Sequence, residues 1–283
     1  MFPKTVDYHK PDKPLVPNGL GIIYVLASVV YLFLLYFFDF KNALPLAVCI
    51  LFGGFMGLVD DWLDLKWRYK ALLPLLVAIP LIALRQGRTV MVIPFIGQLD
   101  FSQIPYGLFI FYLMIIPSIV TVTTNSINML AGLNGLETIC PSIIMVGLMA
   151  TSQHRVLLYV PLVVYMFLSY FNFKGKIFVG NTGSFAVGIN LASFAIIVNN
   201  ERVLLVSLLP YIFNSLIILC NELILNRSPR LKVKDNRLHA DHRRSLVTSI
   251  SYYHPLTERQ LVAVISLIIS SFVSLAILVW FIS

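Results

Sequence analysis

Residues 260–282 read QLVAVISLIISSFVSLAILVWFI and contain no charged side chain. A transmembrane helix needs about 20 consecutive apolar residues to cross the hydrocarbon core of a bilayer, and this stretch supplies them. The whole chain has the same character, since 58% of its 283 residues are hydrophobic and only 12% are charged. A soluble domain carries roughly 25% charged residues. The composition therefore predicts a membrane protein and excludes an ordinary soluble fold.

Further apolar segments precede this one, at lengths that suit bilayer crossing or packing inside a membrane bundle. We predict an all-α fold, a polytopic membrane helical bundle with about nine transmembrane helices. The predicted segments are 20–38, 44–59, 71–85, 106–124, 138–152, 155–171, 182–198, 203–222 and 260–282. Residues 1–18 are polar and proline-rich, and they lack the apolar core of a cleavable signal peptide.

The basic residues indicate the orientation, because short cytoplasmic loops of membrane proteins are rich in Lys and Arg. With the N-terminus in the cytosol, sixteen of the 21 Lys and Arg residues fall on the cytosolic side. The opposite side then holds segment 89–103, whose β-branched residues, Pro94 and Gly97 predict a short non-cytoplasmic β-hairpin. The net charge of +8 is explained by this asymmetry. We therefore expect a lipid bilayer, and no nucleic acid, as partner.

Three acidic residues gather where the second apolar segment ends. Asp60 and Asp64 share one face of a helix, and Asp61 lies about 100° around from Asp60. Carboxylates this close repel one another and are costly at membrane depth, so a divalent cation or a cationic partner would stabilise them. The alternative is a solvated helix end whose charge is balanced by nearby basic residues. The pattern alone does not separate these two interpretations.

Residues 124–137, TNSINMLAGLNGLE, interrupt two apolar helices with three asparagines, two glycines and a glutamate. Irregular backbone and amides are tolerated at membrane depth only where they line a cavity or are buried in protein. Glycine admits close approach of a ligand, and an amide both donates and accepts hydrogen bonds. A capped helix break would explain one asparagine but not three. The segment therefore predicts a binding site.

Two further polar segments fall on the same predicted face. The turn Phe178-Val-Gly-Asn-Thr-Gly-Ser184 leads into a helix, a geometry that suits a phosphate. An ordinary helix cap at Asn181 or Thr182 is the simpler interpretation of that turn taken alone. The loop 226–258 is rich in basic residues and suits a diphosphate or lipid headgroups.

In their order along the chain these segments resemble the eukaryotic and archaeal branch of the polyprenyl-phosphate N-acetylhexosamine-1-phosphate transferases. That branch contains the endoplasmic-reticulum enzymes that start the lipid-linked oligosaccharide and are inhibited by tunicamycin. Its motifs ADDxxxLRWRxK, TNxINxLAGxNGLE and FVGDT are similar to residues 59–70, 124–137 and 178–182 here. The fourteen-residue asparagine motif is the most specific of the three, and the resemblance covers nearly the whole chain.

The resemblance implies roles for individual residues and a Mg²⁺ cofactor, with Mn²⁺ as an alternative. We expect Asp60, Asp61, Asp64 and Lys70 to be catalytic. We expect Asn128 and Asn181 to be the metal ligands. The expected substrate-binding residues are Asn125, Asn128, Gly132, Asn134, Glu137, Arg227 and Arg230.

The resemblance also implies an activity and its setting. We expect transfer of N-acetylglucosamine 1-phosphate from UDP-N-acetylglucosamine to dolichyl phosphate, which yields UMP and the diphospholipid. The protein would be a multi-pass protein of the endoplasmic reticulum membrane, with the active site facing the cytosol, and the family is compatible with a homodimer. Residues 1–283 would form a single membrane-embedded domain, whose active face is made by loops 60–70, 125–137, 173–181 and 224–258.

The sequence also departs from the family's pattern. Asn181 stands where the family has a metal-binding aspartate, and Leu225-Asn226-Arg227 stands where it has Arg-His-Arg. Asn18 and Val6 replace a glutamate and a glutamine that help to hold the nucleotide sugar, and the resemblance implies one further helix before Val6 that these 283 residues do not include. These departures leave open a weakly active or non-catalytic homologue that acts as a regulatory subunit. A polytopic transporter is a further alternative, but it would show inverted repeats with matching polar breaks, which we do not find.

Overall fold

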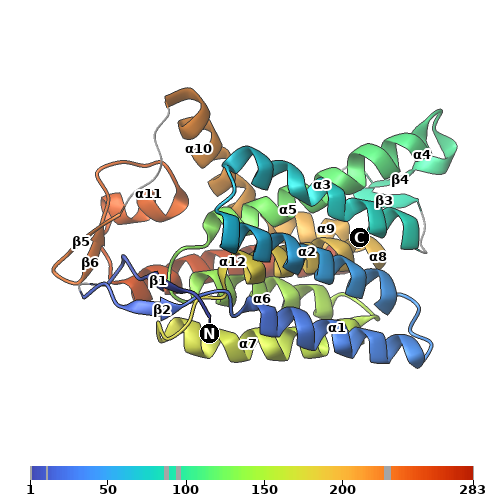
Figure 1. Cartoon of the computed structure of the whole chain (residues 1–283). Helices are drawn as coiled ribbons and strands as arrows, with labels where there is room; N and C mark the ends of the chain where they lie inside the picture. Colours follow the sequence, from blue (N-terminus) through green and yellow to red (C-terminus); the bar gives the residue numbers. More distant parts are fainter. Residues whose placement is uncertain (1, 11, 86–88, 94–96, 226–230, 283) are drawn as a thin grey trace.

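The computed structural model describes residues 2–282 except 11, 86–88, 94–96 and 226–230, and it is mostly helical, as predicted (Figure 1). The principal helices are α1 Gly21–Phe37, α2 Ala43–Leu63, α3 Trp67–Leu84, α5 Ile116–Leu130, α6 Leu136–Ala150, α7 Tyr159–Phe173, α8 Gly180–Ile197, α10 Leu209–Leu225 and α12 Glu258–Ile282. The shorter helices are α4 Gly107–Ile110, α9 Glu201–Ser207 and α11 Leu246–Tyr253. A π-helical turn, Phe111–Ile115, joins α4 to α5, and single 3-10 turns lie at Phe101–Gln103 and Arg155–Leu158.

The structure does not confirm the predicted number of membrane spans. Within the described residues, six helices are long and apolar enough to cross a membrane, and the pair α9–α10 makes a seventh if it counts as one span. The pair is bent by 57°, while α1 and α6 are apolar but shorter than the ~20 residues that a crossing needs. The count of nine is therefore not confirmed, although every predicted segment contains a helix. The chain is a multi-pass membrane protein.

Helix α8 lies at the centre of the bundle, and 89% of its residues are buried inside the protein. Its apolar residues surround the axis, which is typical of a helix enclosed by others. It packs most extensively against α2 and then against α5. Because α2 ends in the acidic segment and α5 ends in the asparagine segment, α8 sets the relative positions of both.

The close approach of α2 to α8 depends on small residues in α2. A Cβ atom on Gly57 would lie 2.2 Å from the carbonyl oxygen of Asn181 and 2.5 Å from the Cα atom of Thr182. One turn earlier, a Cβ atom on Gly53 would lie 2.5 Å from the Cδ1 atom of Ile189. Small residues four positions apart let membrane helices approach closely. The site end of α2 can therefore touch the backbone at the start of α8.

Three antiparallel strand pairs cover the two ends of the bundle: β1 Lys4–Val6 with β2 Leu15–Pro17, β3 Val90–Ile93 with β4 Gly97–Asp100, and β5 Lys232–Lys234 with β6 Arg237–His239. Figure 1 shows β1–β2, β5–β6 and α11 at one end, and β3–β4 with α4 at the other. Strands β3 and β4 fall within segment 89–103 and pair from Val90 with Asp100 to Ile93 with Gly97. The residues that join them lie outside the described part, and the non-cytoplasmic location of this pair stays a prediction.

We expect Gly57→Ala to destabilise the protein more than Gly53→Ala does. The new methyl group at position 57 meets backbone atoms, whereas at position 53 it meets the end of a flexible side chain. Overpacking of this kind costs roughly 1–3 kcal/mol. The melting temperature of detergent-solubilised Gly57→Ala should therefore fall by several degrees, with a smaller fall for Gly53→Ala. Equal melting temperatures for wild type and Gly57→Ala would contradict the close contact of α2 with α8.

Candidate active site

A polar cavity of about 370 Å³ lies at the end of the bundle that carries β1–β2 and α11. Its walls come from parts of the chain that are far apart in sequence. They are the N-terminal strands and Asn18, the end of α2, the residues that follow α5, the start of α6 and the start of α8. Residues from three of the four polar segments of the sequence therefore meet around one space: Asp61, Asn128, Gly132, Glu137 and Asn181.

Asp61 holds the start of α8 against the end of α2. Its Oδ1 atom accepts a hydrogen bond from the backbone nitrogen of Asn181 at 2.8 Å. Its Oδ2 atom accepts hydrogen bonds from the backbone nitrogen and the hydroxyl group of Thr182, at 2.9 and 2.7 Å. The first nitrogens of a helix have no partner inside the helix and carry positive partial charge, so a carboxylate is a favourable partner. Asp61 thus acts as a helix cap supplied by another helix.

Buried Asp60, near the end of α2, forms an ion pair with partly exposed Lys70 in the first turn of α3. Asp60 is only 2% exposed, and its Oδ1 atom accepts from the Lys70 ammonium group at 3.0 Å and from the backbone nitrogen of Leu65 at 3.0 Å. The same ammonium group lies 3.7 Å from Asp64, whose carboxylate is fully exposed. Lys70 is therefore held by one buried and one exposed acidic group.

An apolar groove of about 540 Å³ runs between α3, α5 and α10. Lys70 lies in its wall, and Asn128 lines both the groove and the polar cavity. Asn125 also lines the groove, and its amide nitrogen donates to the carbonyl oxygens of Ala71 and Thr121 at 3.2 and 3.0 Å. The bond to Ala71 holds α3 against α5, and the bond to Thr121 lies within α5. The predicted substrate contact of Asn125 stays a prediction.

The two expected metal ligands line the same cavity. The Oδ1 atom of Asn128 accepts from the Ser184 hydroxyl group at 2.8 Å, and that hydroxyl group lies 3.4 Å from the carbonyl oxygen of Asn181. Ser184 therefore links the two asparagines. A carbonyl oxygen has two lone pairs, so Asn128 keeps one for a further partner. Both side chains offer neutral oxygen donors of the type that Mg²⁺ accepts.

Residues 131–135, which join α5 to α6 and are called the glycine loop below, are open on one side and anchored on the other. Gly132 has φ +113°, and nothing lies within 4 Å of the position that its Cβ atom would take, so a ligand can approach the backbone. Asn134 is only 3% exposed, and its amide nitrogen donates to Asp7 and Glu258 at 2.8 and 2.9 Å. Its backbone nitrogen also donates to Glu258, at 2.8 Å. The Asn134 side chain thus anchors the loop, and its predicted substrate contact stays a prediction.

The same Asp7 and Glu258 belong to a small group of potential metal ligands with His9. One ligand atom from each of the three residues lies within 4.8 Å of the others. Lys10 pairs with Asp7 at 3.2 Å, and the Asn134 amide group lies between the two carboxylates. These cationic and donor groups already balance the acidic charge, so we assign no metal to this group.

Glu137 lies at the start of α6, and its Oε1 atom accepts from the Asn172 amide nitrogen at 2.7 Å and from the Val179 backbone nitrogen at 3.3 Å. Asn172, at the end of α7, is completely buried. Its amide nitrogen also donates to Ile177, and its Oδ1 atom accepts from the backbone nitrogen of Gly135 at 2.7 Å. Asn172 therefore ties the glycine loop to the segment that leads into α8.

The basic loop that follows α10 is only partly described. Arg227 and Arg230 lie outside the described residues, and their predicted substrate contacts stay predictions. Farther along, Lys232 and Asp241 form an exposed ion pair at 2.9 Å. The hydrogen bond and charge of Lys232 hold the pKa of Asp241 below its ordinary value. This pair fixes the base of the β5–β6 hairpin.

The profile of glycosyl transferase family 4 matches residues 43–199, which is more than half of the chain. The chain belongs to glycosyl transferase family 4. The matched residues of this family 4 chain run from α2 to just beyond α8, and they include the acidic segment, the asparagine segment and the start of α8.

Three relatives illustrate the range of the similarity. The UDP-N-acetylglucosamine–dolichyl-phosphate N-acetylglucosaminephosphotransferase of Dictyostelium discoideum is 28% identical over 295 residues, with coverage of 87% of the family 4 chain and 72% of the relative. A provisionally named enzyme of the same kind in Saccharolobus solfataricus is 31% identical over 218 residues, or 73% and 66% of the two chains. The phospho-N-acetylmuramoyl-pentapeptide-transferase of Prochlorococcus marinus is 30% identical over 203 residues, or 65% and 56%. The match spans 66% of the length of the Saccharolobus relative. It spans 64% of a second provisionally named enzyme of this kind, from Sulfolobus acidocaldarius. Both values are just under two thirds.

Two side chains that hold the site together, Asn172 and Glu258, were not predicted from the sequence. Asn172 is a single amide among aromatic residues, and Glu258 is the first residue of an apolar helix. Neither belongs to a motif. The one local signal is an isolated amide, Asn172, at the end of an apolar segment, because such a group needs buried partners.

We expect Asp61→Asn to destabilise the family 4 chain, whereas Asp64→Asn changes its stability little. Asp61 accepts three hydrogen bonds from the start of α8, while the Asp64 carboxylate is exposed. A hydrogen bond to a charged group contributes about 1.5–3 kcal/mol. The melting temperature in detergent should fall by several degrees for Asp61→Asn alone. A fall of the same size in Asp64→Asn would show that loss of charge, and not loss of the helix cap, is responsible.

Proposed function

We propose that this chain transfers N-acetylglucosamine 1-phosphate from UDP-N-acetylglucosamine to dolichyl phosphate. An oxygen atom of the lipid phosphate attacks the β-phosphorus, the diphosphate bond breaks, and UMP leaves with the electron pair of that bond. The observation that carries the proposal is that a polar cavity and an apolar groove meet at Asn128. The names of the Dictyostelium and Saccharolobus relatives support this pair of substrates.

The groove suits the acceptor lipid. Its apolar side chains on α3, α5 and α10 match isoprene units, and Lys70 in its wall matches a phosphate group. Asp60 is buried and holds Lys70, whereas Asp64 is exposed and farther from it. An incoming phosphate would therefore replace Asp64 as the second partner of Lys70. In this proposal Lys70 stabilises the charge of the reacting phosphates, and Asp60 and Asp64 orient it.

The polar cavity suits the nucleotide diphosphate. Glycine backbone at Gly132 is open to a ligand, and Glu137 and Asn181 face the same space. Mg²⁺, or Mn²⁺, is usually held by one or two protein oxygens together with substrate phosphates. The donors at Asn128 and Asn181 fit such an ion, which when bound would neutralise charge on the diphosphate. Asp61 positions Asn181, because both of its carboxylate oxygens are engaged by the start of α8.

The proposed setting is the endoplasmic reticulum membrane, with the active site facing the cytosol and a homodimer as the assembly. The distribution of Lys and Arg supports this orientation, because the described basic residues of β5, β6 and the segment before α11 lie at the end of the bundle that carries the cavity. The relatives described above carry transferase names. We know of no observation among the described residues that favours a regulatory subunit or a transporter.

The test is a transfer assay with purified chain in mixed lipid and detergent. Labelled UDP-N-acetylglucosamine and dolichyl phosphate should give a labelled lipid product that tunicamycin abolishes. Lys70→Met should reduce the rate by about 100-fold, because loss of one preorganised charge at the reacting centre typically has this effect. Lys66→Met, four residues earlier and exposed, is the matched control and should keep its rate. Folded wild type without product would favour the non-catalytic homologue.

Asn181→Asp should lower the Mg²⁺ concentration that gives half-maximal activity, by about ten-fold. The substitution adds one negative charge beside the proposed cation while it keeps an oxygen donor in place. Asn42→Asp makes the same charge change at the start of α2, at the opposite end of that helix from the site, and serves as the control. An unchanged Mg²⁺ requirement in Asn181→Asp would remove position 181 from the proposed metal site.

A further inference from the structure

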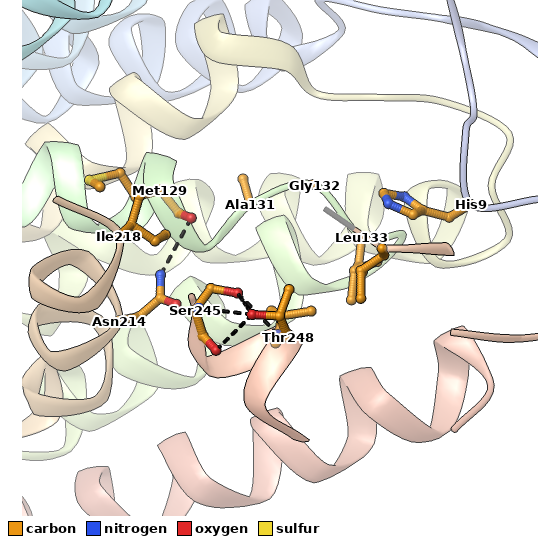
Figure 2. Close-up of a pocket in the computed structure, with 11 residues that line it drawn as sticks. His9, Met129, Ala131, Gly132, Leu133, Asn214, Ile218, Ser245 and Thr248 are labelled. Carbon is orange, nitrogen blue, oxygen red and sulfur yellow. Dashed lines mark hydrogen bonds between the residues drawn. The ribbon is translucent and has the colours of Figure 1, made fainter. Parts of the chain in front are cut away.

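Glu222 is an acidic residue in the wall of the apolar groove, and the proposed reaction gives it no role. It lies in the last turn of α10. The other groove-lining residues of α10 are Ile212, Ser215, Leu216, Ile218 and Leu219. Residues three or four positions apart share one face of a helix, so Glu222 ends a mostly apolar stripe. Figure 2 shows one bond that holds this helix against α5, in which the Asn214 amide nitrogen donates to the Met129 carbonyl oxygen at 3.4 Å.

Glu222 and Lys70 lie at the same end of the groove, on different walls. Helices α3 and α10 both pack against α5, so α5 is the floor of the groove and the other two helices are its walls. Helix α3 begins at the end of the bundle that carries the polar cavity, and α5 and α10 end there. Lys70 is in the first turn of α3, and Asn128 and Glu222 are in the last turns of α5 and α10. A lipid headgroup in the groove therefore meets a cation on one wall and a carboxylate on the other.

The position of Glu222 calls for a cation that the described residues do not supply. The end of a helix carries negative partial charge, so a carboxylate in the last turn is disfavoured unless a cation lies near it. None of the basic side chains in the described part of the chain forms an ion pair with Glu222. The ammonium group of Lys70 is engaged by Asp60 and Asp64, at 3.0 and 3.7 Å.

We propose that the groove also binds a bilayer phospholipid with a primary ammonium headgroup, whose phosphate lies at Lys70 and whose ammonium lies at Glu222. Such a lipid combines an anion, a cation and apolar chains, and the groove offers a partner for each. Dolichyl phosphate has no cation and leaves Glu222 without a partner. A primary ammonium group has three hydrogen-bond donors, whereas a trimethylammonium group has none, so the carboxylate favours the former. The site for this second ligand does not depend on the proposed transfer.

The groove is open to the lipids that surround the bundle. Trp67, Val122 and Leu216, from α3, α5 and α10, are 45%, 44% and 56% exposed. Exposed apolar surface of this kind marks contact with a membrane. A phospholipid of the surrounding leaflet therefore reaches the groove sideways, as dolichyl phosphate would in the proposed reaction. The two lipids then compete for Lys70.

The first test measures lipid binding to the purified full chain in detergent by native mass spectrometry. Dioleoyl phosphatidylethanolamine, phosphatidylcholine and phosphatidylglycerol are titrated separately. Wild type should bind phosphatidylethanolamine about five-fold more tightly than the other two, and Glu222→Gln should lose this preference, because an ion pair at a partly exposed site has about this effect. Asp235→Asn, an exposed acid-to-amide change outside the groove, is the matched control and should keep the preference.

The second test adds the same lipids to the transfer assay. Phosphatidylethanolamine should raise the KM for dolichyl phosphate at unchanged kcat, and it should do so less in Glu222→Gln.

Each result decides the assignment. Loss of the preference in Glu222→Gln with a wild-type melting temperature supports the ammonium site. Wild type that binds the three lipids equally, or Glu222→Gln that keeps the preference, overturns this site and leaves the proposed transfer intact. Wild type that prefers phosphatidylethanolamine but forms no transfer product supports the lipid site and overturns the proposed function.

Discussion

The carboxylate of Asp61 is the contact on which the arrangement of the site depends. It belongs to α2, yet both of its oxygens accept hydrogen bonds from the start of α8. Gly57 allows the two helices to come close enough for these bonds. Because α8 also packs against α5, the same contact brings Asn181 and Asn128 to one cavity through Ser184. A charge at a helix end thus determines where two helices and their polar segments meet.

Much of the fold and part of the site could be predicted from sequence. Apolar length located every principal helix, and the asparagine segment 124–137 was correctly expected to lie beside a cavity. Through-space pairings could not be predicted, because they join residues far apart in the chain. Asn134 bonds to Asp7 and Glu258 across separations of 127 and 124 residues, and no local pattern encodes either pairing. The span count of nine is not confirmed because hydropathy marks an apolar segment but does not fix the length of its helix: α1 and α6 are shorter than the ~20 residues of a crossing, and the pair α9–α10 is bent.

Asn181 has a physical explanation within this arrangement. Its backbone nitrogen donates to Asp61, so an aspartate at 181 would add a second negative charge to this junction. Like charges in one site disfavour one another. The asparagine avoids that repulsion. The asparagine also leaves the cavity with one negative charge fewer than an aspartate would give. A cation there would therefore depend more on the charge of the substrate.

The 57° bend between α9 and α10 has a consequence for the binding of a long lipid. Figure 1 shows α10 leaning away from the other helices at the end that carries the cavity. In the proposed reaction, the groove on α3, α5 and α10 would receive the part of a polyprenyl chain nearest to Lys70, and the rest of the chain would lie among the bilayer lipids. The proposed transferase would then select its acceptor by the phosphate and the first isoprene units, and the membrane that supplies the acceptor would determine the chain length beyond them.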